Sequence, residues 1–388
     1  MVYDKVVIMQ WQNFDKRNSD LFDVPCLLKK GVNVEYWDVS AISIPGYKVH
    51  PYKAPEGLAI RTIIDKKQFV SCIKDNKNTA YIVHMTYGEQ SYLCFRLLSK
   101  YHCTIIYCIN GCLPNLKNEY NSRLSYYKSL SIKTIFNLIK SKIAWAIAKS
   151  PLIAETDYLL LTCAESKVRK ECKVGNKTVC IDYNSCDYQQ SLSTNNISGS
   201  ANETIVFIDQ NLPFHPDNKR NGFSMDANIY FLAMNKLFDV VEKKYNKRVV
   251  IAAHPSCYNE YVKGNYFKDR QILYNRTIEA VRQSWAVIAH NSTAIAFPVI
   301  YRKPIILFTT EEMHSVRKHT CSFCDVYSKM LNCIYVKSEN DIIIPDSLNV
   351  DVAAYDSFKY QYLTNPKSEG VSNGEILLGI LSGHYLKS

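Results

Sequence analysis

Short apolar segments rich in β-branched residues alternate with segments of helical period along most of the chain, and this alternation restricts the fold more than any other feature. It is typical of parallel α/β architecture. In the first half, segments near Lys66–Asn76 and Glu89–Tyr101 have a helical period. The strands predicted around them are Lys5–Trp11, Val32–Val39, Ala80–Met85, Cys103–Ile109, Asp157–Cys163 and Val179–Asn184.

A polar segment, Gln189–Thr204, interrupts this pattern; it is rich in Ser and Asn and has no periodicity, which predicts a loop or linker. The alternation then restarts, with a long helix predicted at Ser224–Tyr245 and a shorter one at Thr277–Ser284. The strands predicted here are Thr204–Gln210, Arg248–Pro255, Trp285–His290 and Lys303–Thr310. At 388 residues the chain has room for two α/β domains, 1–195 and 196–388, and its C-terminal helices could pack back on the first.

The composition is that of a globular protein, with 47% hydrophobic and 21% charged residues. A net charge of +11 favours anionic ligands. No apolar run reaches the roughly 20 residues of a membrane span. The chain opens without a cationic leader, so we expect a cytoplasmic protein whose 14 cysteines are reduced.

One cluster of potential metal ligands contains His314, His319, Cys321, Cys324 and Cys333. A single CxxC with flanking histidines is a weak zinc signal, because a structural site needs a second ligand pair at suitable spacing. Buried free thiols are the preferred interpretation. No acidic pair is placed to hold a metal, so we expect neither a metal nor another cofactor.

Polar residues follow two predicted strands of the second half. Asp209, Gln210 and Asn211 come directly after the first of these strands, and His254 and Pro255 end the second. In open α/β sheets, ligands bind at the carboxyl ends of the strands. Gln210 and Asn211 are candidate nucleotide contacts, although local turns are an equally good interpretation. His254 is a candidate phosphate donor able to carry charge near neutral pH, and Pro255 stops the strand.

A third such position lies in "IAHNSTAIAFPVIYRKPIIL", Ile288–Leu307, where His290, Asn291, Ser292 and Thr293 stand between a strand and a helix-length apolar stretch. A helix that begins near Ser292 would present unpaired N–H groups and its positive dipole end to an anion. Ser and Thr are also ordinary N-caps, which is the competing interpretation.

The order of these motifs, His254-Pro255 followed by Ser292-Thr293, resembles the C-terminal half of GT-B glycosyltransferases that use CMP-activated acidic sugars. The resemblance covers roughly Thr204 to Thr310. It implies two Rossmann-like domains facing a central cleft, with the nucleotide and its phosphate bound by the histidine and the hydroxyls. We therefore expect the donor-binding residues to be Gln210, Asn211, His254, Pro255, His290, Asn291, Ser292 and Thr293.

The same resemblance implies a general base from the N-terminal half, usually in an acidic pair before a glycine. The counterpart here, Ile109-Asn110-Gly111, lacks both carboxylates. Glu89, which follows a predicted strand, is the preferred candidate, and Asp15 is the second. A helix N-terminal carboxylate is an equally good interpretation of Glu89. His254 completes the candidate catalytic residues.

The segment Ser122–Pro151 is basic and contains no acid. Its lysines interleave with large apolar residues, which is typical of an amphipathic helix on an anionic membrane surface. A core helix with a solvated lysine face is the alternative. Its lysines are Lys128, Lys133, Lys140, Lys142 and Lys149.

Together these features predict a metal-independent glycosyltransferase on the inner face of the cytoplasmic membrane. It would move sialic acid, another nonulosonic acid or 3-deoxy-octulosonic acid from a CMP donor to a lipid-linked or oligosaccharide acceptor of bacterial O-antigen or capsule. The alternatives are a UDP-sugar or CDP-alditol-phosphate transferase of the same fold, or a nucleotide-sugar epimerase. Nucleic-acid binding is not expected, because the basic residues gather in one apolar-backed segment.

Overall fold

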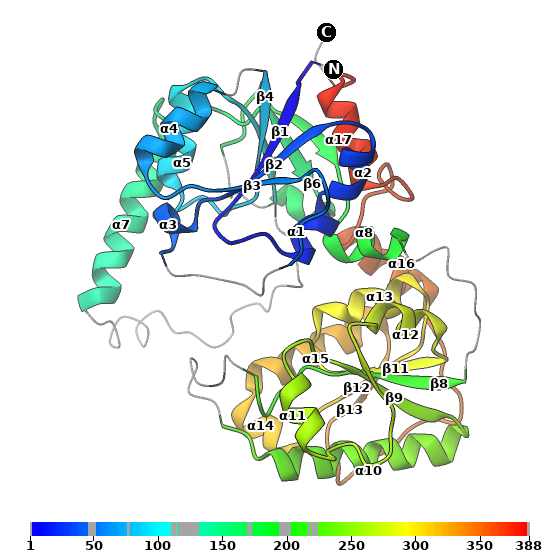
Figure 1. The fold of residues 1–388 in the computed structure, drawn as a ribbon. Coiled ribbons are helices and arrows are strands. Elements are labelled where there is room, and N and C mark those ends of the chain that lie inside the picture. The colour runs from blue at the N-terminus through cyan, green and yellow to red at the C-terminus, as the bar shows by residue number, and fades with distance from the viewer. Residues whose placement is uncertain are drawn as a thin grey trace. The chain divides into compact units, whose positions relative to one another are not determined.

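The computed structural model describes residues 2–45, 52–75, 78–109, 114, 132–168, 173–193, 203–215, 218 and 224–385. The chain divides into two compact units (Figure 1). The first comprises Met1–Cys112, Lys117–Gln189 and Gln361–Ser388, and the second Leu113–Leu116 and Gln190–Tyr360. The division after Gln189 falls close to the predicted boundary at residue 195, and the C-terminal segment belongs to the first unit.

The first unit is built on a parallel sheet with the strand order β3-β2-β1-β4-β5-β6-β7. Consecutive strands lie side by side outward from β1, and the order reverses between β1 and β4. Such a switch point leaves room for ligands at the carboxyl ends of the strands. The strands are β1 (Lys5–Gln10), β2 (Asn33–Asp38), β3 (Ala59–Thr62), β4 (Thr79–Val83), β5 (Thr104–Cys108), β6 (Tyr158–Leu161) and β7 (Val179–Asp182).

Helices cover both faces of this sheet. On one face, α4 (Lys66–Asp75) and α5 (Tyr92–Lys100) bury their apolar sides. On the other lie α2 (Val24–Lys29) and α17 (Asn373–Leu381), which approach so closely that a Cβ at Gly374 would lie 2.7 Å from that of Cys26. The remaining helices are α1 (Lys16–Leu21), α3 (Ser40–Ser43), α7 (Ile132–Lys149), α8 (Cys186–Ser193) and the 3₁₀ helix η1 (Ala164–Val168).

The second unit contains a parallel sheet with the order β10-β9-β8-β11-β12-β13. Its switch point lies between β8 and β11. The register pairs Ile208 of β8 with Ala252 of β9 and with Ala289 of β11, so these three strands end at the same edge. The strands are β8 (Thr204–Ile208), β9 (Arg248–Ala253), β10 (Ile272–Tyr274), β11 (Ala286–Ala289), β12 (Ile305–Phe308) and β13 (Ile334–Val336).

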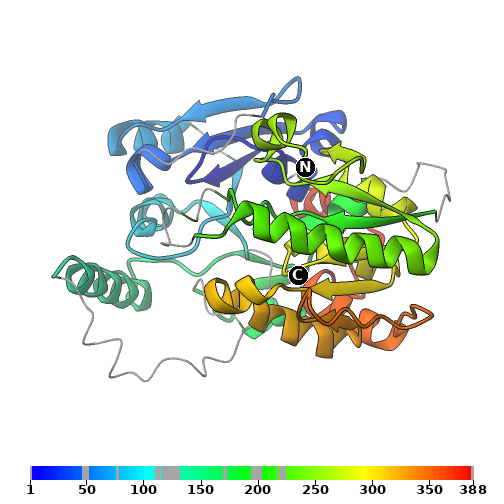
Figure 2. The same cartoon turned by 90° about the horizontal axis from the view of Figure 1, so that it is seen from below.

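The long helix α10 (Ala227–Tyr245) packs along one face of this sheet, as Figures 1 and 2 show. Asp226 caps its first turn. On the other face lie α12 (Thr277–Gln283) and α13 (Ala296–Ile300). The remaining helices are α11 (Tyr258–Lys263), the 3₁₀ helix η2 (Thr293–Ile295), α14 (Glu311–Val316), α15 (Lys318–Leu331) and α16 (Val352–Tyr362).

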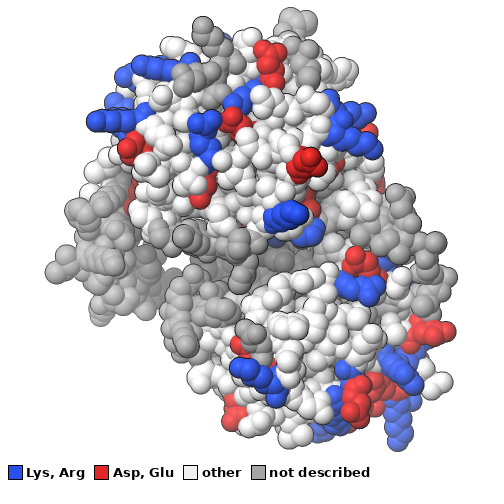
Figure 3. Space-filling view, in the orientation of Figure 1, with Lys and Arg blue, Asp and Glu red and all other residues white. Residues whose placement is uncertain are grey.

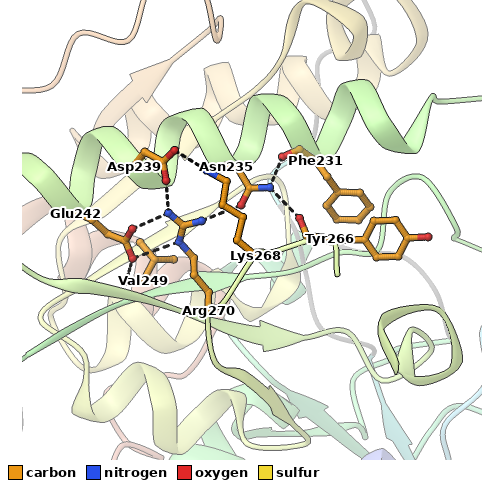
Figure 4. Close-up of polar contacts among 8 residues, drawn as sticks. All are labelled: Phe231, Asn235, Asp239, Glu242, Val249, Tyr266, Lys268 and Arg270. Carbon is orange, nitrogen blue, oxygen red and sulfur yellow. Dashed lines mark hydrogen bonds and ion pairs between the residues drawn. The ribbon is translucent and has the colours of Figure 1, made fainter. Parts of the chain in front are cut away.

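A buried ion-pair network fastens α10 to the segment before β10 (Figure 4). The Arg270 side chain is 8% exposed, and its guanidinium donates to Glu242 at 2.6 Å and 3.2 Å, to Asp239 at 2.5 Å and to Asn235 at 2.8 Å. Glu242 also accepts the N–H of Val249 in β9. The network therefore fixes α10 relative to β9 and to the segment before β10.

The ten predicted strands are all present, with ends shifted by at most a few residues. The strands β3, β10 and β13 were not predicted; they lie at sheet edges and are mostly exposed or half-buried, so they lack a buried apolar run. The predicted loop from Gln189 is wrong for its first residues, since α8 continues to Ser193. Helix α5 begins at Tyr92 and not at Glu89.

Candidate functional site

Three polar loops leave the carboxyl ends of β8, β9 and β11, and β8 lies between the other two strands. These loops therefore meet at the switch point of the second sheet, where the open α/β architecture binds its ligands. Every donor-binding residue predicted from the sequence lies on one of these loops.

Asp209 joins the first two loops. Its carboxylate is buried and accepts the N–H of Asn211 at 2.8 Å, the N–H of His254 at 3.1 Å and the hydroxyl of Tyr261 at 2.9 Å. Burial raises the pKa of this carboxyl above its usual value, although those donors oppose the shift. Asp209 thus braces the β8 and β9 loops against each other.

Gln210 and Asn211 present polar atoms that are not yet satisfied. Oε1 of Gln210 and Oδ1 of Asn211 are buried and lack a hydrogen-bond partner among the described residues. Asn211 is 1% exposed, adopts a left-handed φ of 50° and directs Nδ2 to the Ser256 hydroxyl at 3.4 Å. A buried oxygen without a donor costs about 1–3 kcal/mol. A ligand with hydroxyl or amino groups would remove that cost.

The half-buried His254 follows β9, and its ring is oriented by Ser256. Nδ1 lies 3.2 Å from the Ser256 N–H, which donates to it, and 2.8 Å from the Ser256 hydroxyl. Nδ1 is therefore the acceptor and the proton resides on Nε2. Burial lowers the pKa of His254, and the His215 ring at a centroid distance of 5.5 Å lowers it further. The predicted charge near neutral pH is thus replaced by a neutral imidazole that donates through Nε2. Pro255 is exposed and lies two residues beyond the end of β9 at Ala253.

His290 is placed differently from the other predicted residues. Its ring is fully buried; Nδ1–H donates to the Phe308 carbonyl, and Nε2 accepts from the Tyr230 hydroxyl at 2.9 Å. Burial lowers the pKa of His290 to about 4, so the ring is neutral. Both nitrogens are used inside the unit, which makes His290 a positioning residue for the β11 loop.

The segment after His290 forms a short turn. Ser292 accepts the Ala294 N–H at 3.2 Å and caps η2, a 3₁₀ helix of 3 residues, and α13 that follows has only 5. The helix-length stretch expected from the sequence is therefore divided. Asn291 and Ser292 are half-buried and Thr293 is exposed. Their polar groups lie where a ligand at the β11 end can reach them.

The two predicted carboxylates lie in the first unit. Asp15 caps α1, and it accepts from Asn18 at 2.7 Å and from Gln12 at 2.7 Å, which commits both oxygens to local bonds. Glu89 lies in the turn between β4 and α5, and its Oε2 is buried without a partner among the described residues. Glu89 is therefore the more available acceptor of a proton.

Sequence reasoning missed the residues that orient the site. Ser256 and Tyr261 were not identified, and Asp209 was noted without a role. In the first unit, the buried His84 directly follows β4. Its Nδ1 lies 3.1 Å from Nε2 of Gln10, the last residue of β1, and 3.2 Å from Oδ1 of Asn18 on α1. His84 directly follows β4 and Ser256 lies in the loop after β9, and these positions were the available signal; Tyr261 lies on α11 and carries no such signal.

The CxxC residues lie on α15 as free thiols. Cys321 and Cys324 are buried, and burial raises the pKa of Cys321 to about 11. Within the described part of the chain, no three His, Cys, Asp or Glu side chains are placed to hold a metal ion. The predicted counterpart of the acidic pair, Asn110-Gly111, lies outside the described residues, as does the first part of the basic segment, 122–131.

Charge is dispersed over the surface that Figure 3 shows. Lysine and arginine side chains are interspersed there with aspartate and glutamate. This pattern differs from the concentrated basic stripe that tracks a nucleic-acid backbone. In the described ranges, no helix is both long enough and apolar enough to cross a membrane.

No protein-family model and no curated protein sequence matches the chain. Solved structures do resemble it. A variant of the wall teichoic acid polymerase TagF aligns with a TM-score of 0.53 and 12% identity, over 98% of this chain and 90% of that one. The chain has the GT-B fold. At this identity the likeness establishes the fold and not the reaction.

Weaker likenesses extend over the same length. The UDP-GlcNAc 2-epimerase from Methanocaldococcus jannaschii aligns with a TM-score of 0.46 and 11% identity, over 98% of this chain and 100% of that one. The calicheamicin glycosyltransferase CalG4 aligns with a TM-score of 0.43 and 9% identity, over 98% and 94%.

Proposed function

We propose that this protein is a glycosyltransferase whose nucleotide-sugar donor binds at the β8, β9 and β11 loops. The observation that carries the proposal is the braced arrangement around Asp209. It holds the Asn211 amide oxygen buried and unpaired, while Ser256 occupies Nδ1 of His254 and leaves Nε2–H without a hydrogen-bond partner among the described residues. Preorganised donors and acceptors of this kind stabilise a leaving group without reorganisation.

The proposed donor is a CMP-activated acidic sugar. A CMP-sugar departs with a single phosphate, and the charge that develops on it can be met by one histidine donor, hydroxyls and backbone N–H groups. His254, Ser292 and Thr293 supply those groups here. The unpaired oxygens of Gln210 and Asn211 would accept from the hydroxyls or amino group of the nucleoside. No metal is needed for these contacts.

The general base is proposed in the first unit. Glu89 has an unpaired buried oxygen, whereas both oxygens of Asp15 are occupied at the α1 cap. A carboxylate that removes the proton of the acceptor hydroxyl typically contributes about 10²–10⁴-fold to the rate. Glu89 is therefore the base we favour.

The acceptor is proposed to be lipid-linked, in bacterial O-antigen or capsule synthesis, with the protein peripheral on the inner membrane face. The support is α7, whose Ile139 and Ile143 are 50% and 55% exposed, with Lys142 exposed beside them. Pelleting with anionic vesicles tests this. Ile143→Ser combined with Lys142→Ser should reduce pelleting, while Lys177→Ser, an exposed lysine away from α7, should not.

The donor is tested by calorimetric titration with CMP, UDP, GDP and CDP, each with and without EDTA. Metal-independent binding that prefers CMP supports the proposal. A preference for CDP would favour transfer of an alditol phosphate, and a preference for UDP would favour a UDP-sugar transferase or an epimerase. Absence of binding to every nucleotide would return these loops to a structural role.

A further inference from the structure

The first unit encloses a cavity of about 1220 Å³ that the proposed reaction does not use. It lies beside β7, which pairs only with β6 in the described sheet and forms its edge. Cys180 and Ile181 of β7 both line it. Its volume exceeds the roughly 300–1,000 Å³ of ordinary small-molecule pockets.

The walls are mainly apolar and come from both faces of the sheet. Tyr87 stacks edge-on against Phe95 at 5.1 Å and against Trp145 of α7 at 5.4 Å between ring centroids. The Tyr87 hydroxyl also donates to the Ala144 carbonyl at 2.8 Å, which holds α7 on the unit. Ile376 of α17 lines the cavity from the other face of the sheet. Two helices thus enclose an apolar space around an open sheet edge.

Two of the apolar residues that line the cavity remain accessible to solvent. Trp145 is 38% exposed and Val174 is 49% exposed. Apolar surface at the cavity is therefore open to solvent, and exposed apolar patches mark interaction sites.

The charges at the cavity are mainly positive. Lys167 and Lys367 are exposed lining residues, and neither forms an ion pair with a described residue. Lys173 also lines it and donates to backbone carbonyls at 2.7 Å and 3.1 Å, with no carboxylate partner among the described residues. Asp182 supplies the acidic group among the lining residues. The excess of lysines over acidic side chains among the lining residues favours a ligand with an anionic head group.

We propose that this cavity binds the hydrocarbon chain of an anionic lipid, with its phosphate against Lys167 and Lys367. An apolar chain suits the aromatic and aliphatic walls, and the lysines supply charge-assisted bonds at the head. The site lies wholly in the first unit and needs no nucleotide. Its test can therefore fail or succeed independently of the proposed transferase activity.

The probe is dodecyl phosphate below its micelle concentration, titrated calorimetrically into the full chain. We expect saturable binding at one site. Octyl and decyl phosphates should bind progressively more weakly, by about fourfold for each methylene removed. Farnesyl phosphate has the same head group. Tighter binding than dodecyl phosphate would show that the lipid is an isoprenoid, and weaker or equal binding would show that it has a straight hydrocarbon chain. Either result supports the lipid site.

Matched variants test whether the hydrocarbon chain of the lipid occupies the cavity. Ala148→Trp on α7 fills the cavity and should weaken binding at least about tenfold, whereas Ala146→Trp, two residues away and not lining it, should leave affinity unchanged. Ala154→Trp, at an exposed lining position, provides a second filling variant should Ala148→Trp melt early. Lys167→Gln with Lys367→Gln should weaken dodecyl phosphate binding more than Lys177→Gln.

Each of the following results would overturn the proposal. Equal affinity of the filling variants and Ala146→Trp would place the chain elsewhere. Affinity that does not depend on chain length, or that inorganic phosphate reproduces, would show that the lysines bind an anion alone. Binding of dodecyl maltoside as tight as that of dodecyl phosphate would show that the charged head contributes nothing. Absence of binding by every amphiphile tested would show that the cavity does not bind a lipid.

Discussion

At the scale of single residues, two histidines that look alike in sequence have different environments. His254 and His290 each follow a buried strand of the second sheet. Ser256 occupies only Nδ1 of His254, while Tyr230 and the Phe308 carbonyl occupy both nitrogens of His290. The partners of His290 come from α10 and β12, far away in the sequence. Only His254 is therefore placed to contact a ligand.

His254→Ala should weaken CMP binding by about tenfold to a hundredfold, because a hydrogen bond to a charged group contributes about 1.5–3 kcal/mol. The melting temperature should change little, since the ring is half-buried and its Nε2 has no partner among the described residues. Calorimetry and thermal melting measure both quantities, with the exposed His319→Ala as the control. Unchanged affinity with intact melting would contradict the phosphate role.

His290 should make the second unit acid-sensitive. Because burial lowers its pKa from 6.5 to about 4, the unfolded chain binds this proton more readily. The stabilising effect is complete above pH 6.5 and is lost as the pH falls toward 4. The loss amounts to about 2 kcal/mol at pH 5.

Urea unfolding of the wild type and His290→Gln at pH 7.5 and pH 5 measures this loss. The variant should be less stable at pH 7.5 but should lose less between the two pH values. The exposed His319→Gln should keep the wild-type dependence. Parallel pH dependences of wild type and His290→Gln would show that acid acts elsewhere.

At the scale of elements, side-chain contacts hold helix α10 and the β11 turn in place. The Arg270 network joins α10 to β9 and to the segment before β10 (Figure 4). Ser292 caps η2 in the same unit. Each contact can be removed by substitution and compared with a matched control: Lys268 for Arg270, and the N-cap Ser372 for Ser292.

Arg270→Met should destabilise the second unit by about 1.5–3 kcal/mol, because it removes the buried guanidinium that donates to Glu242 and Asn235. The half-exposed Asp239 keeps its pair with Lys268, and Glu242 keeps the Val249 N–H. Lys268→Met is the matched control. Lys268 pairs with the same Asp239 at 2.8 Å, but its side chain is 56% exposed, so the cost should stay below about 1 kcal/mol. Chemical denaturation compares the two. Equal losses would mean that burial does not govern this network.

Ser292→Ala with Thr293→Ala should weaken CMP binding and cost about 1 kcal/mol from the lost cap. Ser372→Ala removes a comparable N-cap, from α17 in the first unit, and should lower stability without affecting the nucleotide. Titration and melting of both variants separate the cap from the ligand contact. Unaltered CMP affinity in the double variant would leave η2 as an ordinary capped turn.

At the scale of the whole molecule, each unit contributes one part of the proposed reaction. The donor loops belong to the second unit and the favoured base belongs to the first. The C-terminal segment Gln361–Ser388 completes the first unit through α17, whose Ile376 and Leu377 pack on the first sheet. Binding and turnover should therefore respond to substitutions in different units.

Glu89→Gln should lower the transfer rate by about 10²–10⁴-fold and leave CMP affinity unchanged. Asp15→Asn should reduce stability through the α1 cap, with a smaller effect on rate. Release of CMP from a CMP-sugar in the presence of acceptor measures turnover, and calorimetry measures binding. Full activity of Glu89→Gln would assign the base to another residue.

The sequence by itself predicted the parallel α/β class, ten strands, a division near residue 195 and the position of the polar loops at strand ends. These features depend on periodicity and on the residues that directly follow a strand, which are local properties. The edge strands β3, β10 and β13 and the start of α5 at Tyr92 were not predicted, because no buried apolar run or local boundary signal marks them.

The tertiary structure decided everything that depends on distant partners. It placed His290 inside and left His254 half-buried beside Ser256, it braced Asp209 against the β9 loop, and it left the amide oxygen of Asn211 unpaired. It also returned α17 to the first sheet and enclosed the apolar cavity at the β7 edge. Burial and hydrogen-bond partners follow from packing between elements, and residue order alone does not specify that packing.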